Sequence, residues 1–171
     1  MRIPIGVIAA TAAALTASAA IDGQTREPVK AKSDVVVRSR QQVADIEKML
    51  AAKPGNTNEN IVAPSGMQTR VAVFHDSRRV DDLNEVHDLS DDIYYVLKGE
   101  ATLVLGGSLI DPQEISPGEW RAKTATGGRE IKIKKGDLVF VPRGTPHQRT
   151  VAGKGFSMIL IKIFAVEQPG K

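Results

Sequence analysis

The 171-residue sequence contains no cysteine. This absence excludes a disulfide-stapled fold, a zinc site built from thiolates, a cysteine nucleophile and a lipid attached to an N-terminal cysteine. Aromatic residues are also scarce, since the chain has one Trp, two Tyr and four Phe. They are scattered rather than interleaved with a basic stripe, and the formal net charge is only +3. Nucleic acid is therefore not expected as a partner.

The signatures of several enzyme classes are missing as well. The chain has no phosphate-binding glycine loop, no dinucleotide-binding fingerprint and no nucleophile elbow with a Ser-His-Asp arrangement. What it does have is the composition of a folded domain. Hydrophobic residues make up 42% and charged residues 25%, which argues against a disordered chain, and the length fits one domain of ordinary size.

The N-terminus has the features of an export signal. Met1 and Arg2 supply a positive charge, residues 3–20 are uncharged and rich in Ala, and the small residues at 17–19 suit a signal peptidase. The alternative is a membrane anchor, because the uncharged stretch approaches the ~20 residues that cross a bilayer. Its many Ala, Ser and Thr residues favour cleavage. We expect a signal peptide over 1–20, a bacterial periplasmic or secreted location, and no stable membrane span after cleavage.

Residues 21–60 predict an N-terminal arm followed by one helix. The arm is polar until Val35–Val37, which is interpreted as able to add an edge strand. A capping-box pattern begins at Ser39, and apolar residues then follow at helical spacing, which predicts an amphipathic helix from about 40 to 52. The Asn-rich stretch 56–60 predicts a loop.

Residues 61–171 follow the rhythm of a β domain, with short apolar or alternating segments separated by Gly-containing turns. The predicted strands are 71–74, 84–88, 93–97, 101–105, 130–134, 138–141 and 158–164. After a single helix, this pattern predicts an all-β antiparallel sandwich or barrel. Residues 107–128 depart from it and predict a long loop, a lid or a packed surface segment. Trp120 lies in its middle and is expected to pin the loop to the barrel rather than bind a ligand.

Two motifs carry the residues of greatest chemical interest. The first consists of Glu85-Val86-His87, Asp92 and Gly99, with four and six residues between the three parts. The second consists of Gly136, Pro142-Arg143-Gly144 and His147, with five and two residues between. Together they resemble the two signature motifs of the cupin superfamily, G(X)5HXH(X)3–4E(X)6G and G(X)5PXG(X)2H(X)3N. The resemblance covers about residues 70–165, and it implies a cupin-like barrel, a double-stranded β-helix or jelly roll.

The resemblance also implies a cofactor, one divalent metal ion of Fe, Mn, Ni, Co or Zn. The residues at or beside the family's ligand positions are Glu85, His87, Asp92 and His147. Glu85 stands where the family has its first histidine, Asp92 replaces the family's glutamate and is one methylene shorter, and Val151 replaces the final asparagine.

The spacing of these residues supports a common site independently of the resemblance. Three pairs lie two positions apart on predicted strands, so each pair shares one face: Glu85 with His87, Asp92 with Tyr94, and His147 with Arg149. If the barrel closes, these faces converge inside it. Burying imidazoles and carboxylates together is costly unless a divalent cation compensates.

Proton transfer and contact with the substrate are the other roles expected of these residues. Glu85 or Tyr94 is expected to carry a proton, and Tyr94 and Arg149 to contact the substrate. For Arg149, a contact with a substrate carboxylate and a salt bridge at the barrel rim are both open. His75 matches no motif and is expected to be structural.

The first functional hypothesis is a metal-dependent enzyme, of the dioxygenase, isomerase or lyase type that the resemblance implies, acting on a small polar or carboxylated organic molecule. The second is a non-catalytic cupin that binds a small ligand or metal, which the replacement of a ligand histidine by Glu85 favours. A third is a purely structural dimer module. A homodimer joined through sheet edges is expected in each case.

Overall fold

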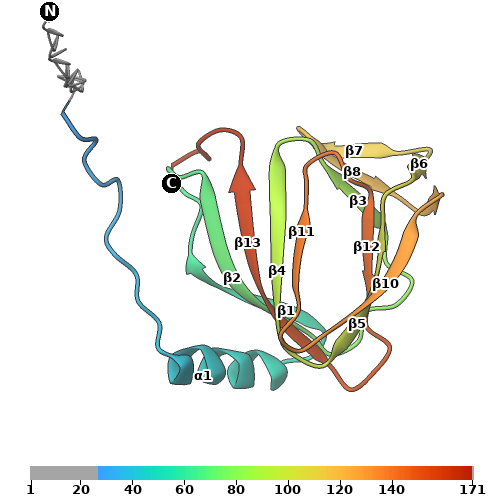
Figure 1. Cartoon of the computed structure of the whole chain (residues 1–171), viewed down its shortest axis with the longest axis horizontal. Helices are drawn as coiled ribbons and strands as arrows, with labels where there is room; N and C mark the ends of the chain where they lie inside the picture. The colour runs from blue at the N-terminus through green and yellow to red at the C-terminus, as the bar shows by residue number, and fades with distance from the viewer. Residues whose placement is uncertain (1–26, 171) are drawn as a thin grey trace, which may run out of the picture. The chain divides into compact units, whose positions relative to one another are not determined.

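The computed structural model describes residues 27–170 (Figure 1). The predicted signal peptide at 1–20 lies outside the described residues. The chain divides into two units, residues 1–31 and 32–171, and the fold below is that of the second unit. Among the described residues, no helix has the length and apolar character needed to cross a membrane.

The helix α1 (Arg40–Ala51) forms where the sequence predicted it. Its capping box is complete, because the Gln42 backbone N–H donates to the Ser39 hydroxyl while the Ser39 N–H donates to the Gln42 side chain. Leu50 is fully buried and anchors the helix against the two strands that follow it in the chain. Sequence periodicity and capping were therefore sufficient to place α1.

Two expectations beside the helix were wrong. The segment 56–60, expected as a loop, belongs to strand β1 (Asn56–Val62), which pairs with β2 (Thr69–Asp76). Asn has low strand propensity, but β1 is an edge strand, and its polar side chains find partners on β2. Val35–Val37, expected as an edge strand, lies outside any strand, with Val35 91% exposed.

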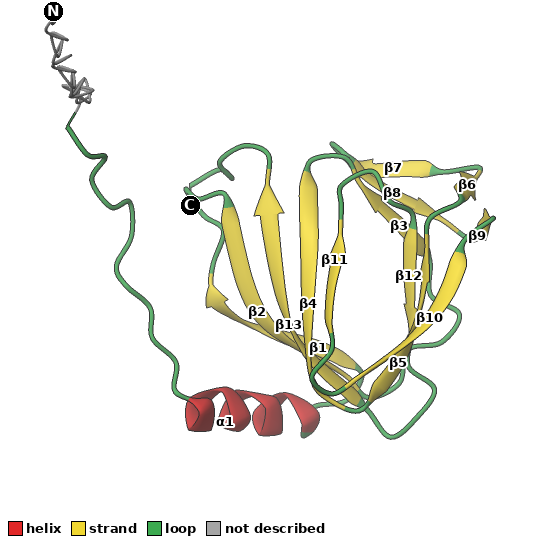
Figure 2. Ribbon diagram, in the orientation of Figure 1, coloured by secondary structure: helices red, strands yellow, loops and turns green. Residues whose placement is uncertain are grey.

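The structure describes thirteen strands in two main antiparallel sheets and one small one (Figure 2). The strands after β2 are β3 (Asn84–His87), β4 (Ser90–Lys98), β5 (Glu100–Leu105), β6 (Ser108–Ile110), β7 (Gln113–Ser116), β8 (Glu119–Ala122), β9 (Thr124–Thr126), β10 (Arg129–Lys134), β11 (Leu138–Val141), β12 (His147–Thr150) and β13 (Phe156–Phe164). The first sheet has the order β1-β2-β13-β4-β11 and the second the order β10-β5-β12-β3-β8-β7, while β6 pairs with β9.

Eight of these strands have the order of a jelly roll. If β2, β3, β4, β5, β10, β11, β12 and β13 are numbered 1 to 8, the first sheet reads 1-8-3-6 and the second 5-4-7-2. Strands that follow one another in the chain thus mostly lie in opposite sheets, as in the double Greek key of jelly rolls. The predicted all-β antiparallel fold with one short helix is confirmed.

The interior is apolar at one end and polar at the other. Along β4 the inward side chains change from Val96 to Asp92, and along β13 they change from Met158 to Lys162. Because Lys162 pairs with Asp92 and Met158 with Val96 across the two strands, the polar residues of both strands meet at the same end. The apolar end forms the hydrophobic core. The polar end contains the inward-facing side chains that can bind a ligand or a metal ion.

The segment 107–128, expected as a long loop, instead folds into the short strands β6 to β9. Its β8 pairs with β3 and its β7 with β8, so it extends the second sheet. Strands of three or four residues are too short to show alternation in the sequence, which is why the loop prediction was wrong. Trp120 donates from Nε1 to Asp88 Oδ2 at 2.7 Å, so it attaches this segment to the turn after β3, in agreement with the expected pinning role.

Candidate metal centre

Three side chains with metal-binding atoms meet at the polar end of the barrel. Glu85 and His87 on β3 and His147 on β12 each offer one ligand atom, and these atoms all lie within 4.8 Å of one another. Sheet pairing explains the meeting, because Glu85 and His147 are direct partners in the register of β3 and β12. His87 joins them because it lies two residues further along the same face of β3.

Both histidines are held through Nδ1. His147 Nδ1 lies 2.9 Å from the Thr145 carbonyl oxygen, and since a carbonyl only accepts, Nδ1 carries the proton and Nε2 keeps a lone pair. His87 Nδ1 lies 2.6 Å from Glu119 Oε2. A histidine whose second nitrogen is bonded to a carbonyl or carboxylate is the usual form of a metal ligand. The two rings therefore present Nε2 to a common space.

The third donor, Glu85, is fixed by two arginines. Arg79 Nη2 lies 3.1 Å from Oε1, and Arg121 Nη2 lies 3.0 Å from Oε2. An ionised carboxylate offers about four acceptor positions, so these contacts leave room for another partner. Two imidazoles and one carboxylate are a donor set suited to first-row divalent metals, and the residues present therefore fit the metal ion that the sequence implied.

Asp92 lies beside this group rather than within it. Its Oδ1 is 2.8 Å from Lys162 Nζ, its Oδ2 is 3.5 Å from His87 Nε2, and it accepts a hydrogen bond of 3.3 Å from the Tyr94 hydroxyl. Of the four ligands expected from sequence, the structure thus brings three together and places Asp92 in an ion pair on the facing sheet.

The charges of the site are coupled. Burial disfavours the charged form of His87, but its hydrogen bonds to Asp92 and Glu119 outweigh burial and raise the pKa of His87 to about 9. Burial also opposes ionisation of Asp92, yet contacts with His87 and Lys162 lower the pKa of Asp92 to about 2. Burial lowers the pKa of His147. Without a metal ion, the contacts with carboxylates thus favour the protonated form of His87, whereas burial favours the neutral form of His147.

Tyr94 and Arg149 are both buried in the wall of the cavity. Burial raises the pKa of Tyr94, so its hydroxyl keeps its proton and donates to Asp92. Arg149 Nε pairs with Asp76 Oδ2 at 2.8 Å, and its guanidinium lies 5.8 Å from the Tyr94 ring centroid and 5.9 Å from that of Phe156. The salt bridge considered for Arg149 exists, but it lies in the barrel interior and not at the rim.

Several charged residues of the cavity were not found in the sequence. The cavity has a volume of about 380 Å³. Its additional charged lining residues are Arg70, Arg79, Glu119, Arg121 and Lys162. Glu119 and Arg121 flank Trp120 in β8. If 119–122 had been recognised as a strand, the alternation of side chains along it would have placed both charged residues on one face and predicted them as a pair. His75 is not part of the lining and is bonded through Nδ1 to Ser157 Oγ at 2.9 Å, which agrees with its expected structural role.

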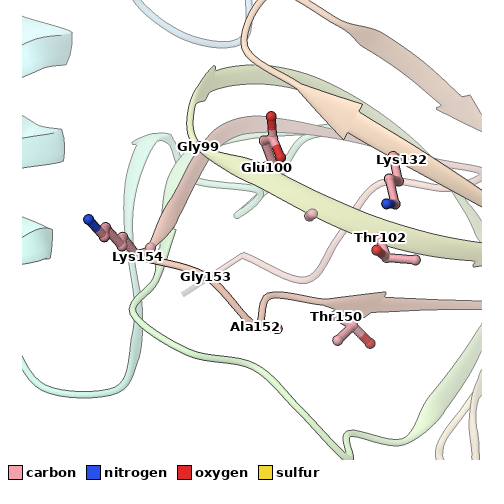
Figure 3. Close-up of a pocket in the computed structure, with 10 residues that line it drawn as sticks. Gly99, Glu100, Thr102, Lys132, Thr150, Ala152, Gly153 and Lys154 are labelled. Carbon is pink, nitrogen blue, oxygen red and sulfur yellow. The ribbon is translucent and has the colours of Figure 1, made fainter.

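A second hollow lies on the outer side of the second sheet (Figure 3). Thr102 is the register partner of both Thr150 and Lys132, so these three side chains form a row across β12, β5 and β10. Lys154 lines the same hollow from the turn after β12. None of the site residues expected from the sequence lines it, and the candidate centre is therefore the interior cavity.

No family model matches the chain, and no curated protein matches it. Solved structures do align with it. KdgF from Halomonas sp. is 16% identical over 66% of this chain and 82% of its own, with a TM-score of 0.45. The DMSP lyase DddQ from Ruegeria pomeroyi DSS-3 is 17% identical over 67% of this chain and 49% of its own, with a TM-score of 0.45. HppE in its iron(II) form is 14% identical over 64% of this chain and 50% of its own, with a TM-score of 0.48. The chain thus spans about half the length of DddQ and HppE.

These are cupin-fold proteins, and at such identities and scores none of their activities transfers to this chain. The assignment of the fold rests on two features of the chain itself. Its eight principal strands have the jelly-roll order, an architecture that includes the cupins. Its two sequence motifs bring Glu85, His87 and His147 together inside that barrel. The chain therefore has the cupin fold that its motifs predicted.

Proposed function

We propose that this chain is a metalloprotein that holds one divalent metal ion through Glu85, His87 and His147, and that it is an enzyme for a small polar or carboxylated organic molecule. The observation that carries the proposal is the meeting of three ligand atoms within 4.8 Å, with both imidazoles held through Nδ1. The reaction is of the dioxygenase, isomerase or lyase type.

A bound divalent cation would supply Lewis acidity to a substrate oxygen. The residues of the chain supply the rest. Thr145 and Glu119 orient the two imidazoles, and Arg79 and Arg121 hold the Glu85 carboxylate in place. With Glu85 assigned to the metal ion, Tyr94 is the proton carrier that remains of the two expected from the sequence, and its hydroxyl donates to Asp92 in the wall of the same cavity.

A pair of isosteric variants tests the ligand assignment. We expect Glu85→Gln to weaken Zn²⁺ binding by at least tenfold and Asp92→Asn to weaken it less, because Asp92 lies outside the three-residue group. Isothermal titration calorimetry on protein purified without an affinity tag provides the measurement, and His147→Ala is expected to abolish binding. The opposite ranking would make Asp92 the carboxylate ligand, and failure of the reconstituted wild type to bind about one equivalent would reject the metal centre.

The alternative function is non-catalytic binding of a small ligand or metal. It is favoured by the ion pairs that already hold the carboxylates, Glu85 to Arg79 and Arg121 and Asp92 to Lys162. A screen of small acids and sugars against metal-loaded protein, with oxygen consumption and product formation monitored, separates the two functions. Binding without turnover in that screen favours the alternative.

Location and assembly complete the proposal. We propose export to the periplasm or the medium, on the basis of the charged, apolar and small-residue order of residues 1–20. We also propose a homodimer, supported by the exposed apolar side chains of Leu138 and Phe140 on the edge strand β11. N-terminal sequencing of the protein from the periplasmic fraction tests the first of these proposals.

A further inference from the structure

The interior cavity is lined by five arginine and lysine side chains, and four of them pair with carboxylates. The pairs are Arg79 and Arg121 with Glu85, Arg149 with Asp76, and Lys162 with Asp92. Arg70 is the fifth cation of the lining, and no carboxylate of the described residues forms an ion pair with it. Its charge is therefore not neutralised by a direct partner.

Neutral groups hold Arg70 in place instead. Its Nε donates to Asn60 Oδ1 at 2.8 Å and its Nη2 donates to Asn58 Oδ1 at 2.7 Å. Both asparagines come from β1, and the guanidinium also lies 5.4 Å from the centroid of the Phe74 ring. The side chain is thus fixed in direction while keeping its full charge.

The remaining donors of Arg70 suit a planar anion. A guanidinium has five N–H groups, and the two asparagines use one on Nε and one on Nη2. Two N–H groups on Nη1 and one on Nη2 remain, which is enough for the paired hydrogen bonds that arginine makes with a carboxylate. Burial lowers the pKa of Arg70, because a partly buried cation is costly without a counter-ion, and an anionic ligand would relieve this cost.

Arg70 lines the same cavity as the candidate metal centre but belongs to the other sheet. Arg70 is the register partner of Lys162 on β13, which is in turn the partner of Asp92 on β4. These three residues form one row across the first sheet, whereas Glu85, His87 and His147 belong to the second sheet. Both groups line the same cavity. A ligand bound at Arg70 therefore lies on the wall that faces the candidate metal centre.

We propose that Arg70 is an anion-binding subsite, and that the substrate is a small acid whose carboxylate binds Arg70 while a second polar group reaches the metal centre. Asn58 and Asn60 are positioning residues that act through Arg70. The inference rests on the proposed function for the role of the second group, but binding of the anion at Arg70 does not require the metal.

Titration with matched acids and amides tests the subsite. Malonate, succinate and glutarate are titrated by calorimetry into metal-free protein and into Zn²⁺-loaded protein, alongside the neutral diamides malonamide, succinamide and glutaramide. We expect at least one dicarboxylate to bind at least tenfold more tightly than its diamide. Arg70→Gln is expected to remove at least tenfold of that affinity while Zn²⁺ affinity stays within twofold of wild type.

The control is Arg78→Gln, the same chemical change at an exposed position outside the cavity lining, which is expected to bind like the wild type. If Arg70→Gln fails to fold, Asn58→Ala and Asn60→Ala provide the test, since each is expected to weaken dicarboxylate binding without changing Zn²⁺ binding. Equal binding of acids and diamides, or wild-type acid affinity in the Arg70 and asparagine variants, overturns the inference. If the wild type does not bind Zn²⁺, the metal centre is rejected. The titration of acids into metal-free protein then still tests whether Arg70 binds an anion.

Discussion

At the scale of single residues, His87 occupies a central place because both of its ring nitrogens face carboxylates. Nδ1 is bonded to Glu119 at 2.6 Å, and Nε2 lies 3.5 Å from Asp92 and 3.9 Å from Glu85. The first contact orients the ring, and the other two lie on the side where a cation would bind. A proton and a bound metal ion would therefore compete for Nε2 of His87.

Glu119 provides the first prediction at this scale. Glu119→Gln removes the negative charge from the hydrogen bond to His87 Nδ1, and we expect Zn²⁺ affinity to fall about 10- to 100-fold, as for other carboxylates bonded to ligand histidines. Competition with a chromophoric chelator measures the affinity. Glu130→Gln, at an exposed position of β10, is the matched control. An unchanged affinity in Glu119→Gln would contradict a role for Glu119 in orienting the ligand.

The raised pKa of His87 predicts a pH dependence of stability in metal-free protein. Because the pKa is about 9 in the folded protein and about 6.5 in an unfolded chain, the stabilisation is fully present below pH 6.5 and is lost as pH rises through 9. The difference corresponds to about 3 kcal/mol. Urea unfolding in excess chelator between pH 6 and 9.5 measures it, and His87→Gln is expected to lose most of this dependence. Parallel curves for the two proteins would refute the prediction.

The sequence was sufficient for some site residues and not for others. Glu85, His87 and His147 could be predicted because motif spacing and strand alternation place them on inward faces. Glu119 could not, because its segment was interpreted as a loop, which has no face. Arg70 was missed because its importance comes from lacking a carboxylate partner, a property that only the folded arrangement reveals.

At the scale of elements, the glycines of the two motifs have different physical reasons. Gly99, in the turn between β4 and β5, has φ +78°, and a Cβ there would overlap the Gly155 carbonyl oxygen. Gly136, before β11, has φ +91° but open space around it. The first glycine is required by close backbone approach as well as by conformation, the second by conformation alone.

These two positions form a matched pair of substitutions. We expect Gly136→Ala to reduce the free energy of unfolding by about 1 kcal/mol, the cost of a left-handed conformation for a residue with a Cβ. Gly99→Ala is expected to lose about 3 kcal/mol, because the overlap with Gly155 adds a packing cost. Urea unfolding monitored by circular dichroism gives both values. Equal losses would show that the backbone at Gly155 moves away freely.

Elements with strong local signals were predictable, and those stabilised by their partners were not. The helix α1 has its capping box and apolar spacing within its own sequence, and strands such as β4 and β13 have apolar runs. In contrast, β1 is rich in asparagine and exists because β2 and Arg70 provide partners. Within 107–128, β8 pairs with β3, β7 pairs with β8 and β6 pairs with β9, and no local pattern of three or four residues can indicate such pairing.

At the scale of the whole molecule, a metal ion that binds the folded barrel alone is expected to stabilise it. At a free Zn²⁺ concentration of one hundred times Kd, mass action contributes about 2.7 kcal/mol, which corresponds to a rise in Tm of roughly 5–10 °C for a domain of this size. Differential scanning calorimetry measures the shift, and chelator should reverse it. His147→Ala is expected to show no shift, and an equal shift in that variant would place the ion elsewhere.

The exposed apolar residues of the first sheet predict an assembly. Leu138 and Phe140 lie on edge strand β11 with 69% and 58% of their surfaces exposed, and Tyr95 is the register partner of Leu138. Such a patch on a sheet edge is typical of an interface. We expect light scattering to give the mass of a homodimer and Phe140→Lys to give that of a monomer. A wild-type monomer at high protein concentration would contradict the dimer.

The segment that carries Glu119 has a consequence for how this architecture diversifies. The eight jelly-roll strands supply Glu85, His87 and His147 as well as Asp92, whereas the hydrogen bond that orients the His87 ring through Nδ1 comes from Glu119 in the segment inserted between β5 and β10. The positions of the candidate ligands and the orientation of one of their rings are thereby determined by separate segments of the chain. Exchanging the inserted segment while keeping the eight strands would therefore change the affinity of the candidate centre for a metal ion. The ligand residues themselves would stay the same.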